Sequence, residues 1–334
     1  MRILVHEYIC GGGLAGATLP AGLSAEGRLM LEGLLADFSA LPGHEVLTTL
    51  DPRVSIPASL PVRVIPVREQ LETVLEELVP QVDAALVVAP ETGGLLARLT
   101  EIIERQGKVN LGSSSGAART AGDKGLTGRL LLDGDLPVPR TLEVTFADDF
   151  LGQASEIGYP AVIKPRDGVG CSGVGLARDP SEMTALVEGL RGECSSFLIQ
   201  EFVPGVPASA SLVANGREAA ALTLNLQEIE IGPRFVYRGG QVPLDDPLRE
   251  PALRYAERAC AAIPGLRGYV GVDLVLSKAG PTIIEINPRV TTAYIGLRRV
   301  LRDNPISLIL KACMDGQLPR NVALSGVHQF SVKD

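Results

Sequence analysis

The chain has 334 residues, of which 46% are hydrophobic and only 4% aromatic, and it carries 37 glycines and a net charge of −8. This length exceeds that of one typical hydrophobic core, so we expect two or three domains of the α/β class. The acidic balance, without a long Lys/Arg block, argues against nucleic acid or a membrane as a partner. Five widely spaced cysteines with no CxxC pair indicate a reducing compartment, and we expect a cytoplasmic protein.

Residues 1–110 alternate strand and helix patterns, which predicts a doubly wound parallel sheet. We expect strands at 1–9, 44–50, 62–67, 83–90 and 108–112. We expect helices at 24–41, 68–79 and 94–107, the first of them capped by Ser24.

Residues 11–16 fit the pattern G-x-G-x-x-G directly after the first strand. With Asp51 as a ribose-binding acid, this pattern allows an NAD(P)-binding oxidoreductase as an alternative function. However, Pro20 delays the helix to about Ser24, which is too late for Gly16 to pack beneath it. We therefore favour a flexible loop on the substrate side.

A second unit begins near residue 113 with a helix at 116–132 and a Pro-containing link at 135–141. A small α/β module follows, with strands at 160–165 and 196–203 and a helix at 181–190. The remainder predicts a larger antiparallel sheet with a helix at 245–263. The expected domains are 1–112, 113–200 and 201–334.

The segment 162–175, VIKPRDGVGCSGVG, places a lysine on a strand immediately before a glycine hairpin. Its glycines expose backbone N–H groups and permit the close approach of an anion. It is not a Walker loop, because no Lys-Ser/Thr follows the last glycine. The chain also lacks the HRD and DFG motifs of a protein kinase. This arrangement predicts Lys164 beside phosphates that the loop covers. Downstream, the hinge-like FLIQEFVPG at 197–205 offers the backbone groups of Glu201 and Val203 to an adenine edge.

The stretch 271–289 reads as a hairpin with a three-residue connection, Lys278-Ala279-Gly280. Pairing Ser277 with Pro281 places Asp273 opposite Glu285, with Asn287 on the same face. Facing carboxylates repel, so the hairpin needs a cation between them. Three oxygen donors without histidine or thiol favour Mg²⁺ or Mn²⁺ over zinc.

The order of these motifs resembles that of the ATP-grasp ligases: Asp123-Lys124, Lys164 with its glycine loop, QEFVPG, and then Asp273…Glu285-x-Asn287. The match covers about 110–290, and residues 1–110 look like the domain that precedes it in those enzymes. The resemblance implies an ATP-grasp fold: an N-terminal Rossmann-like pre-ATP-grasp domain, a small lid and a C-terminal antiparallel sheet. It also implies an ATP- and Mg²⁺-dependent carboxylate–amine ligase acting through an acyl phosphate.

The resemblance further assigns the site residues. Arg289 would clamp the transferring phosphoryl group or a carboxylate, and Lys164 would act with it. Asp273, Glu285 and Asn287 would hold the metal ion. One departure concerns the ribose, because Ser209 and Ser211 stand where these enzymes often carry an acid. The residues expected to contact ATP are Lys124, Lys164, Gly168, Gly170, Ser172, Gly173, Gln200, Glu201, Phe202 and Val203.

Within the family, MRILVHEYICGGG, LNLQEIE (224–230) and EINPRVTTAYIGLRR (285–299) are most similar to tyramine–L-glutamate ligases of methanofuran-type cofactor biosynthesis. That similarity implies L-glutamate and tyramine as small-molecule substrates, and the sequence leaves a homodimer open. Three other functions stay open: a ligase for a different amino acid and amine, the NAD(P)-binding oxidoreductase, and a non-catalytic ATP-binding sensor. The candidate substrate residues are Glu7, Glu26, Arg28, Asn225, Gln227 and Thr291.

Overall fold

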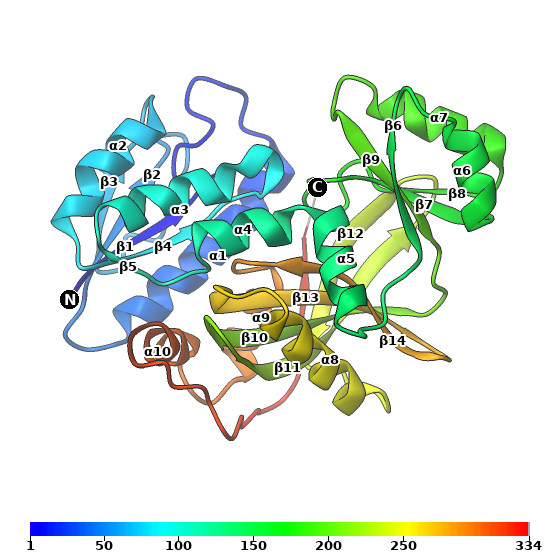
Figure 1. Cartoon of the computed structure of the whole chain (residues 1–334). Helices are drawn as coiled ribbons and strands as arrows, with labels where there is room; N and C mark the ends of the chain where they lie inside the picture. Colours follow the sequence, from blue (N-terminus) through cyan, green and yellow to red (C-terminus); the bar gives the residue numbers. More distant parts are fainter. Residues whose placement is uncertain (333–334) are drawn as a thin grey trace.

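A computed structural model describes residues 1–332, which form three sheets surrounded by helices (Figure 1). The first sheet is five-stranded and parallel, with the order β3-β2-β1-β4-β5, as the alternating pattern predicts. Its strands are β1 Arg2–Glu7, β2 Glu45–Leu50, β3 Val62–Pro66, β4 Ala84–Val88 and β5 Val109–Asn110. Its helices are α1 Ala21–Ser39, α2 Leu71–Leu78 and α3 Leu95–Arg105, with short 3₁₀ turns η1 Val79–Gln81 and η2 Thr92–Gly94.

Helix α1 begins three residues before the predicted start. Pro20 is its N-cap residue, and the Ser24 side chain does not cap the helix as we had expected. Ser24 instead lies in the first turn, where its N–H donates to the Pro20 C=O at 2.9 Å. Proline is tolerated at a helix entrance because the first N–H groups have no intrahelical acceptor.

The second sheet, which we call the lid (residues 141–201), has four antiparallel strands in the order β6-β9-β7-β8. It has its own core beneath two helices, α6 and α7, and most of it lies at the opposite end of the molecule from the first domain (Figure 1). The prediction assigned no element between the link at 135–141 and the strand at 160–165, so it missed β6 and α6, and it also left out β8. The lid elements are β6 Thr141–Thr145, α6 Phe150–Ile157, β7 Ala161–Pro165, β8 Gly175–Ala177, α7 Pro180–Leu190 and β9 Ser196–Glu201.

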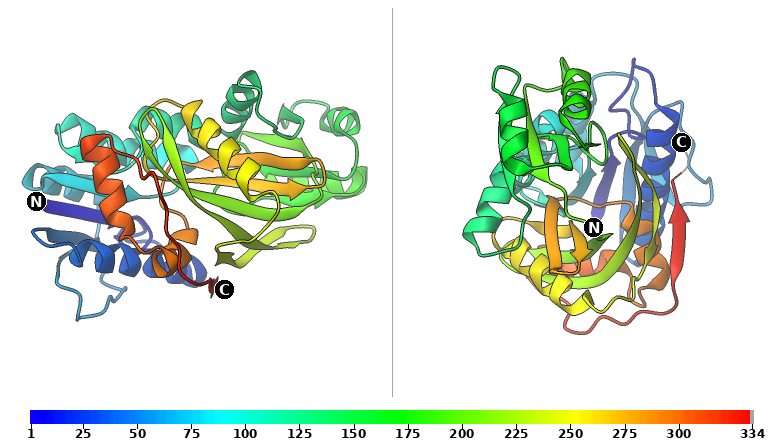
Figure 2. Two further views of the ribbon diagram at one scale, coloured as in Figure 1. Left: turned by 90° about the horizontal axis from the view of Figure 1, so that it is seen from below. Right: turned by 90° about the vertical axis from the view of Figure 1, so that its right-hand side faces the viewer.

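The third sheet is six-stranded and antiparallel, as predicted, with the order β14-β13-β10-β11-β12-β15. Helix α8 covers its outer face (Figure 2). Its strands are β10 Val206–Asn215, β11 Ala219–Ile231, β12 Phe235–Val242, β13 Arg267–Ser277, β14 Gly280–Asn287 and β15 His328–Ser331. The associated helices are α4 Ser115–Gly122, α5 Lys124–Asp133, α8 Arg249–Ala261, α9 Ala293–Val300 and α10 Pro305–Leu310, followed by the π-helical turn η3 Lys311–Asp315.

Two cores hold this sheet in place. The outer core joins α4, α5 and α8 to inward-facing residues of β10, β11, β13 and β14. The second core is continuous with the first domain, because side chains of α1 and β1 pack with Tyr269, Tyr294 and the residues of α9 and α10. The first domain and the six-stranded sheet therefore form one packed body, whereas the lid has a separate core.

The predicted helix at 116–132 is two helices that meet at Asp123. Asp123 has an extended backbone (φ −88°, ψ 96°), which ends α4, and its carboxylate accepts the Leu126 N–H at 3.0 Å, which caps α5. Aspartate favours this position because its short side chain reaches the free N–H groups of the next turn. The break places Lys124 at the first position of α5.

The hairpin at 271–289 has a tighter turn than predicted. Ser277 pairs with Gly280, which leaves a two-residue connection, Lys278-Ala279. A bulge between Asp273 and Leu274 then inserts one extra residue into β14, so Asp273 still pairs with Glu285. The expected juxtaposition of acids is present, but by a different register.

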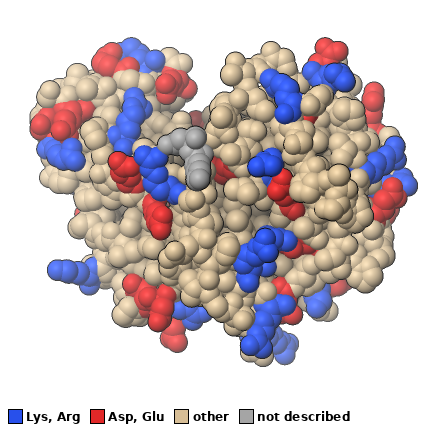
Figure 3. All heavy atoms as spheres, turned by 180° about the vertical axis from the view of Figure 1, so that it is seen from behind, with Lys and Arg blue, Asp and Glu red and all other residues tan. Residues whose placement is uncertain are grey.

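Charged side chains of both signs are interspersed on the face drawn in Figure 3, with no continuous block of either sign. Of the helices in residues 1–332, none combines the length and apolar character that crossing a membrane requires.

Candidate active site

Two half-buried carboxylates, Asp273 and Glu285, face each other on β13 and β14. The Asn287 Nδ2 donates to Asp273 Oδ2 at 3.1 Å, and the Gln227 Nε2 donates to Asp273 Oδ1 at 3.0 Å. Burial, together with the charge of Glu285, raises the pKa of Asp273 to about 8. In the described part of the chain no three His, Cys, Asp or Glu side chains gather as metal donors. A cation here would therefore be held by two carboxylates, an amide oxygen and donors from a ligand.

Two lysines approach this acid pair. The Lys124 Nζ lies 3.1 Å from Glu285 Oε2 and donates to the Gly168 C=O at 2.6 Å. Burial of Glu285 acts to raise its pKa, but the charges of Lys124 and Lys164 outweigh that effect and lower it. The site therefore combines two ammonium groups with two carboxylates.

Lys164 on β7 is only 3% exposed, and its Nζ has no hydrogen-bond acceptor among residues 1–332. Burial lowers the pKa of this ammonium to about 8. A buried donor without an acceptor is costly, so such groups in native proteins usually await a ligand, water or ion. An anionic group such as a phosphate would fit this position.

The glycine loop connects β7 to β8 next to Lys164. Gly170 and Gly173 both have a left-handed backbone, with φ of 56° and 71°. A Cβ on Gly173 would lie 2.7 Å from Pro165, so the loop folds closely over the end of β7. The exit of the loop is tied to the β11–β12 turn, where the Phe235 N–H donates to the Val174 C=O at 3.0 Å. Gly168 and Ser172 belong to the same loop, and Ser172 is exposed.

The predicted hinge follows β9. The Gln200 Nε2 donates to Thr141 Oγ1 at 2.8 Å, and the Glu201 N–H donates to the Arg140 C=O at 2.8 Å. The Glu201 N–H is therefore engaged within the protein. The Glu201 C=O and the Val203 N–H stay the predicted partners for a base, next to the half-buried Phe202.

The serines that occupy the expected ribose position are buried in a polar network on β10. The Asn225 Nδ2 donates to Ser209 Oγ at 3.3 Å and to Ser211 Oγ at 3.0 Å. Ser211 also hydrogen bonds to Tyr269 Oη at 2.8 Å, and Tyr269 Oη in turn contacts Thr291 Oγ1 at 3.1 Å. Asn225 and Thr291 therefore line the polar face of the sheet beside the acid pair. The hydroxyls of Ser211 and Tyr269 connect them.

Arg289 forms a buried ion pair with Glu91 from the first domain, with Nε 2.9 Å from Oε1. Burial acts to lower the pKa of Arg289, but the adjacent Glu91 outweighs it and raises that pKa. Glu91 was not among the predicted residues. The sequence does carry a signal for it, because Glu91 follows the buried strand β4 at the carboxyl edge of a parallel sheet, where ligands usually bind.

Three candidates from the first domain have different environments. Glu26 is close enough to Arg289 for that charge to act on it, although burial dominates and raises the pKa of Glu26. Glu7 is buried, and its carboxylate accepts the N–H groups of Ile9 at 3.1 Å and Cys10 at 2.8 Å. Arg28 instead pairs along the surface of α1 with Glu32 at 3.3 Å. Glu7 and Glu26 are therefore both close enough to Arg289 for its charge to act on them, whereas Arg28 is engaged with Glu32.

The glycine loop at 11–16 is packed at Gly11, Gly12 and Gly13, whereas Gly16 is exposed. A Cβ on Gly13 would lie 2.3 Å from the Tyr8 ring, and a Cβ on Gly12 would lie 2.4 Å from Val67. The Asp51 carboxylate binds Arg53 through two bonds of 2.9 and 2.7 Å. The acid required by the oxidoreductase alternative is therefore occupied by a neighbouring arginine.

Comparison with known families agrees with this geometry. Residues 121–293 match the ATP-grasp domain, and residues 44–118 match the pre ATP-grasp 3 domain. The chain belongs to the ATP-grasp family. Enzymes of this family are ADP-forming ligases that use ATP and Mg²⁺, and the amide-forming members join a carboxylate to an amine.

Relatives and solved structures of the ATP-grasp family cover nearly the whole chain. A tyramine–L-glutamate ligase of Methanocaldococcus jannaschii is 32% identical over 89% of this chain and 84% of its own. An ATP-grasp superfamily protein from Archaeoglobus fulgidus has a TM-score of 0.71 at 27% identity, covering 96% of this chain and 90% of its own. The D-alanine–D-alanine ligase of Bacillus anthracis, solved with ATP, shares the fold with a TM-score of 0.67 at 17% identity, covering 95% of this chain and 100% of its own.

Proposed function

We propose that this chain joins L-glutamate, through its γ-carboxylate, to tyramine in an ATP- and Mg²⁺-dependent reaction. The observation that carries the ATP-dependent chemistry is the buried, unpartnered ammonium of Lys164 beside the Asp273–Glu285 pair. The choice of glutamate and tyramine is supported by the 32% identity to a ligase with that name.

The reaction follows from the poor reactivity of a carboxylate. Its oxygen attacks the γ-phosphorus of ATP, the bond to ADP breaks, and an acyl phosphate forms. The amine nitrogen then attacks the acyl carbon, phosphate leaves with the bonding electrons, and the nitrogen loses a proton. Positioning and charge neutralisation supply most of the rate enhancement in such transfers.

The residues of this chain would divide the work by charge. Lys124 and Lys164 would neutralise phosphate oxygens, and Arg289 would hold either the transferring group or a substrate carboxylate. Asp273, Glu285 and Asn287 would hold Mg²⁺, which supplies further charge neutralisation when it is bound. The lid would exclude water, which would otherwise hydrolyse the acyl phosphate.

The deciding experiment measures ADP release from Mg·ATP with L-glutamate, with and without tyramine, and identifies the product by mass. We expect tyramine-dependent ADP release and a γ-glutamyltyramine mass. ADP release only with another amine would keep the ligase and reject the substrate pair. If no acid and amine pair gives turnover, while Mg·ATP raises the melting temperature, a non-catalytic nucleotide-binding protein would be the better description.

A further inference from the structure

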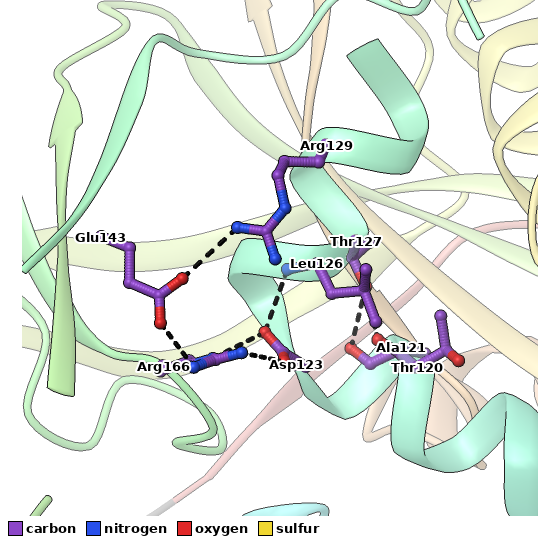
Figure 4. Close-up of polar contacts among 8 residues, drawn as sticks. All are labelled: Thr120, Ala121, Asp123, Leu126, Thr127, Arg129, Glu143 and Arg166. Carbon is purple, nitrogen blue, oxygen red and sulfur yellow. Dashed lines mark hydrogen bonds and ion pairs between the residues drawn. The ribbon is translucent and has the colours of Figure 1, made fainter. Parts of the chain in front are cut away.

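Asp123 and Arg166 form a two-point ion pair between helix α5 and the start of the glycine loop (Figure 4). The Arg166 Nε donates to Asp123 Oδ1 at 2.9 Å, and its Nη2 donates to Oδ2 at 2.5 Å. This forked geometry fixes the orientation of the partners as well as their distance. The remaining guanidinium nitrogen of Arg166 binds Glu143 on β6, so the same arginine also holds the lid sheet.

The ion pair stands next to both lysines of the site. Asp123 directly precedes Lys124, and Arg166 follows Lys164 by two residues. The Lys124 N–H donates to the Arg166 C=O at 3.0 Å, so the backbones of the two segments are also joined. Because Asp123 caps α5 through the Leu126 N–H, the first turn of α5 and the end of β7 are held as one unit.

The two ammonium groups need such a restraint. Lys124 and Lys164 are close enough for their charges to interact unfavourably, and both are drawn toward Glu285. Their mutual repulsion opposes this attraction, and a rigid connection keeps their spacing fixed before an anion arrives. Lysines that are already in place bind phosphates without first losing conformational freedom.

We propose that Asp123 and Arg166 are positioning residues that set the spacing of Lys124 and Lys164 for the nucleotide phosphates. This inference rests on the proposed function, since Mg·ATP is the ligand that the lysines would bind. Neither Asp123 nor Arg166 has to touch the nucleotide, because the pair acts through Lys124.

A double-mutant cycle tests whether Arg166 acts through Lys124. The dissociation constant for Mg·ATP is measured by calorimetry for the wild type, Arg166→Met, Lys124→Met and the double variant. We expect Arg166→Met to weaken Mg·ATP binding about tenfold in the wild type and to have little further effect in Lys124→Met. Arg166→Lys, which keeps the charge but loses the fork, should recover part of the affinity.

The matched control is Arg129→Met. Arg129 binds the other oxygen of Glu143, with Nη1 3.3 Å from Oε2, but its side chain is 58% exposed and makes no bond to Asp123 in Figure 4. Its removal should leave the affinity for Mg·ATP unchanged. The KM values for the acid and the amine should stay constant in Arg166→Met, because the pair lies at the nucleotide end of the site.

Two results would overturn the inference. One is an unchanged dissociation constant in Arg166→Met, and the other is a double variant whose loss of binding free energy equals the sum of the two single losses. If Arg166→Met unfolds, Asp123→Asn replaces it, because asparagine keeps the oxygen that caps α5. A wild-type protein that does not bind Mg·ATP would reject the proposed function itself. If the wild type binds Mg·ATP but the losses in the cycle are additive, only the positioning role of Asp123 and Arg166 is rejected.

Discussion

At the scale of single residues, the site places charges of like sign side by side. A bound ligand of opposite charge would reduce the repulsion between them. Asp273 faces Glu285 across the hairpin, and Lys124 and Lys164 both act on Glu285. Such pairs are destabilising in the absence of a partner of opposite charge. The residues that look least favourable for stability are therefore the ones expected to contact Mg²⁺ and phosphate.

Glu285→Gln should reduce turnover by at least about 100-fold, because an amide cannot supply the negative charge that a metal ion needs. The fold should survive, since the substitution also removes the repulsion with Asp273. Steady-state ADP release and thermal melting check both statements. The control is Glu218→Gln on the exposed β10–β11 turn, which should behave as the wild type. Full activity in Glu285→Gln would exclude this metal site.

His6 makes a pH-dependent contribution to stability. It is fully buried, its Nδ1 lies 2.6 Å from Thr49 Oγ1, and burial lowers its pKa to about 3. Because the pKa is about 6.5 in the unfolded chain, the folded state is favoured above pH 6.5, and this contribution is lost as the pH falls toward 3. We expect His6 to account for about 2 kcal/mol of lost unfolding free energy between pH 6.5 and 5.

Urea unfolding of the wild type and His6→Asn at pH 7.5 and pH 5 tests this contribution. The asparagine can still reach Thr49 but has no proton to gain, so its stability should fall less over this interval. Curves that fall in parallel would show that other groups carry the acid sensitivity.

At the scale of elements, the glycine loop between β7 and β8 is fixed at both ends. Arg166 and Lys124 hold its entrance, and the Phe235 N–H holds its exit. Another bond reaches the first domain, where the Gly93 N–H donates to Asp167 Oδ2 at 2.9 Å. Movement of the loop over a nucleotide is therefore concentrated in residues 169–173.

Substitution of two glycines of this loop distinguishes the cost of backbone strain from the cost of steric crowding. Gly170 and Gly173 both have positive φ, but a Cβ on Gly170 would meet nothing within 4 Å, whereas on Gly173 it would lie 2.7 Å from Pro165. Gly170→Ala should lose about 1 kcal/mol of unfolding free energy, and Gly173→Ala about 1–3 kcal/mol more. Urea unfolding measures the difference, and the KM for ATP should rise more in Gly173→Ala. Equal losses would mean that the loop relaxes around the added methyl group.

The elements also show how far the sequence allows prediction. The parallel sheet, the antiparallel sheet and the facing acids are local patterns of period and spacing, and these predictions are confirmed. The break at Asp123 was missed although aspartate is a local N-cap signal, and the bulge beside Leu274 was missed because no local pattern specifies it. The Arg289–Glu91 pair joins residues 198 positions apart, which no local pattern specifies. The roles of the predicted site residues stay predictions.

At the scale of the whole molecule, the lid is the part that has a core of its own. The first domain and the six-stranded sheet share a continuous core. Asp37 on α1 reinforces it by accepting hydrogen bonds from Arg298 Nη2 at 2.7 Å and Tyr294 Oη at 2.7 Å. The lid contributes nothing to that core, and polar contacts at Arg166, Asp167 and Val174 join it to the rest of the molecule. We expect closure to move the part of the lid beyond these contacts against that rigid body.

Hydrogen exchange should distinguish the lid from the rest of the molecule by the exchange rates of their amides. Without ligand, amides of the lid should exchange faster than those of β1, β4 and β13, because a small separate core opens at lower free energy. Addition of Mg·ATP should slow exchange most in the lid and its glycine loop. Exchange that slows equally over the whole chain would indicate a rigid molecule and contradict lid closure.

The strand β15 has a consequence for any shortened form of the protein. It pairs with β12 and so covers one edge of the six-stranded sheet, while at the opposite edge the Ile283 N–H of β14 donates to the Pro137 C=O at 2.8 Å. Removing residues 328–331 would uncover the hydrogen-bonding groups of β12, and exposed strand edges of this kind associate between molecules. We expect such a truncated protein to self-associate, which light scattering would detect.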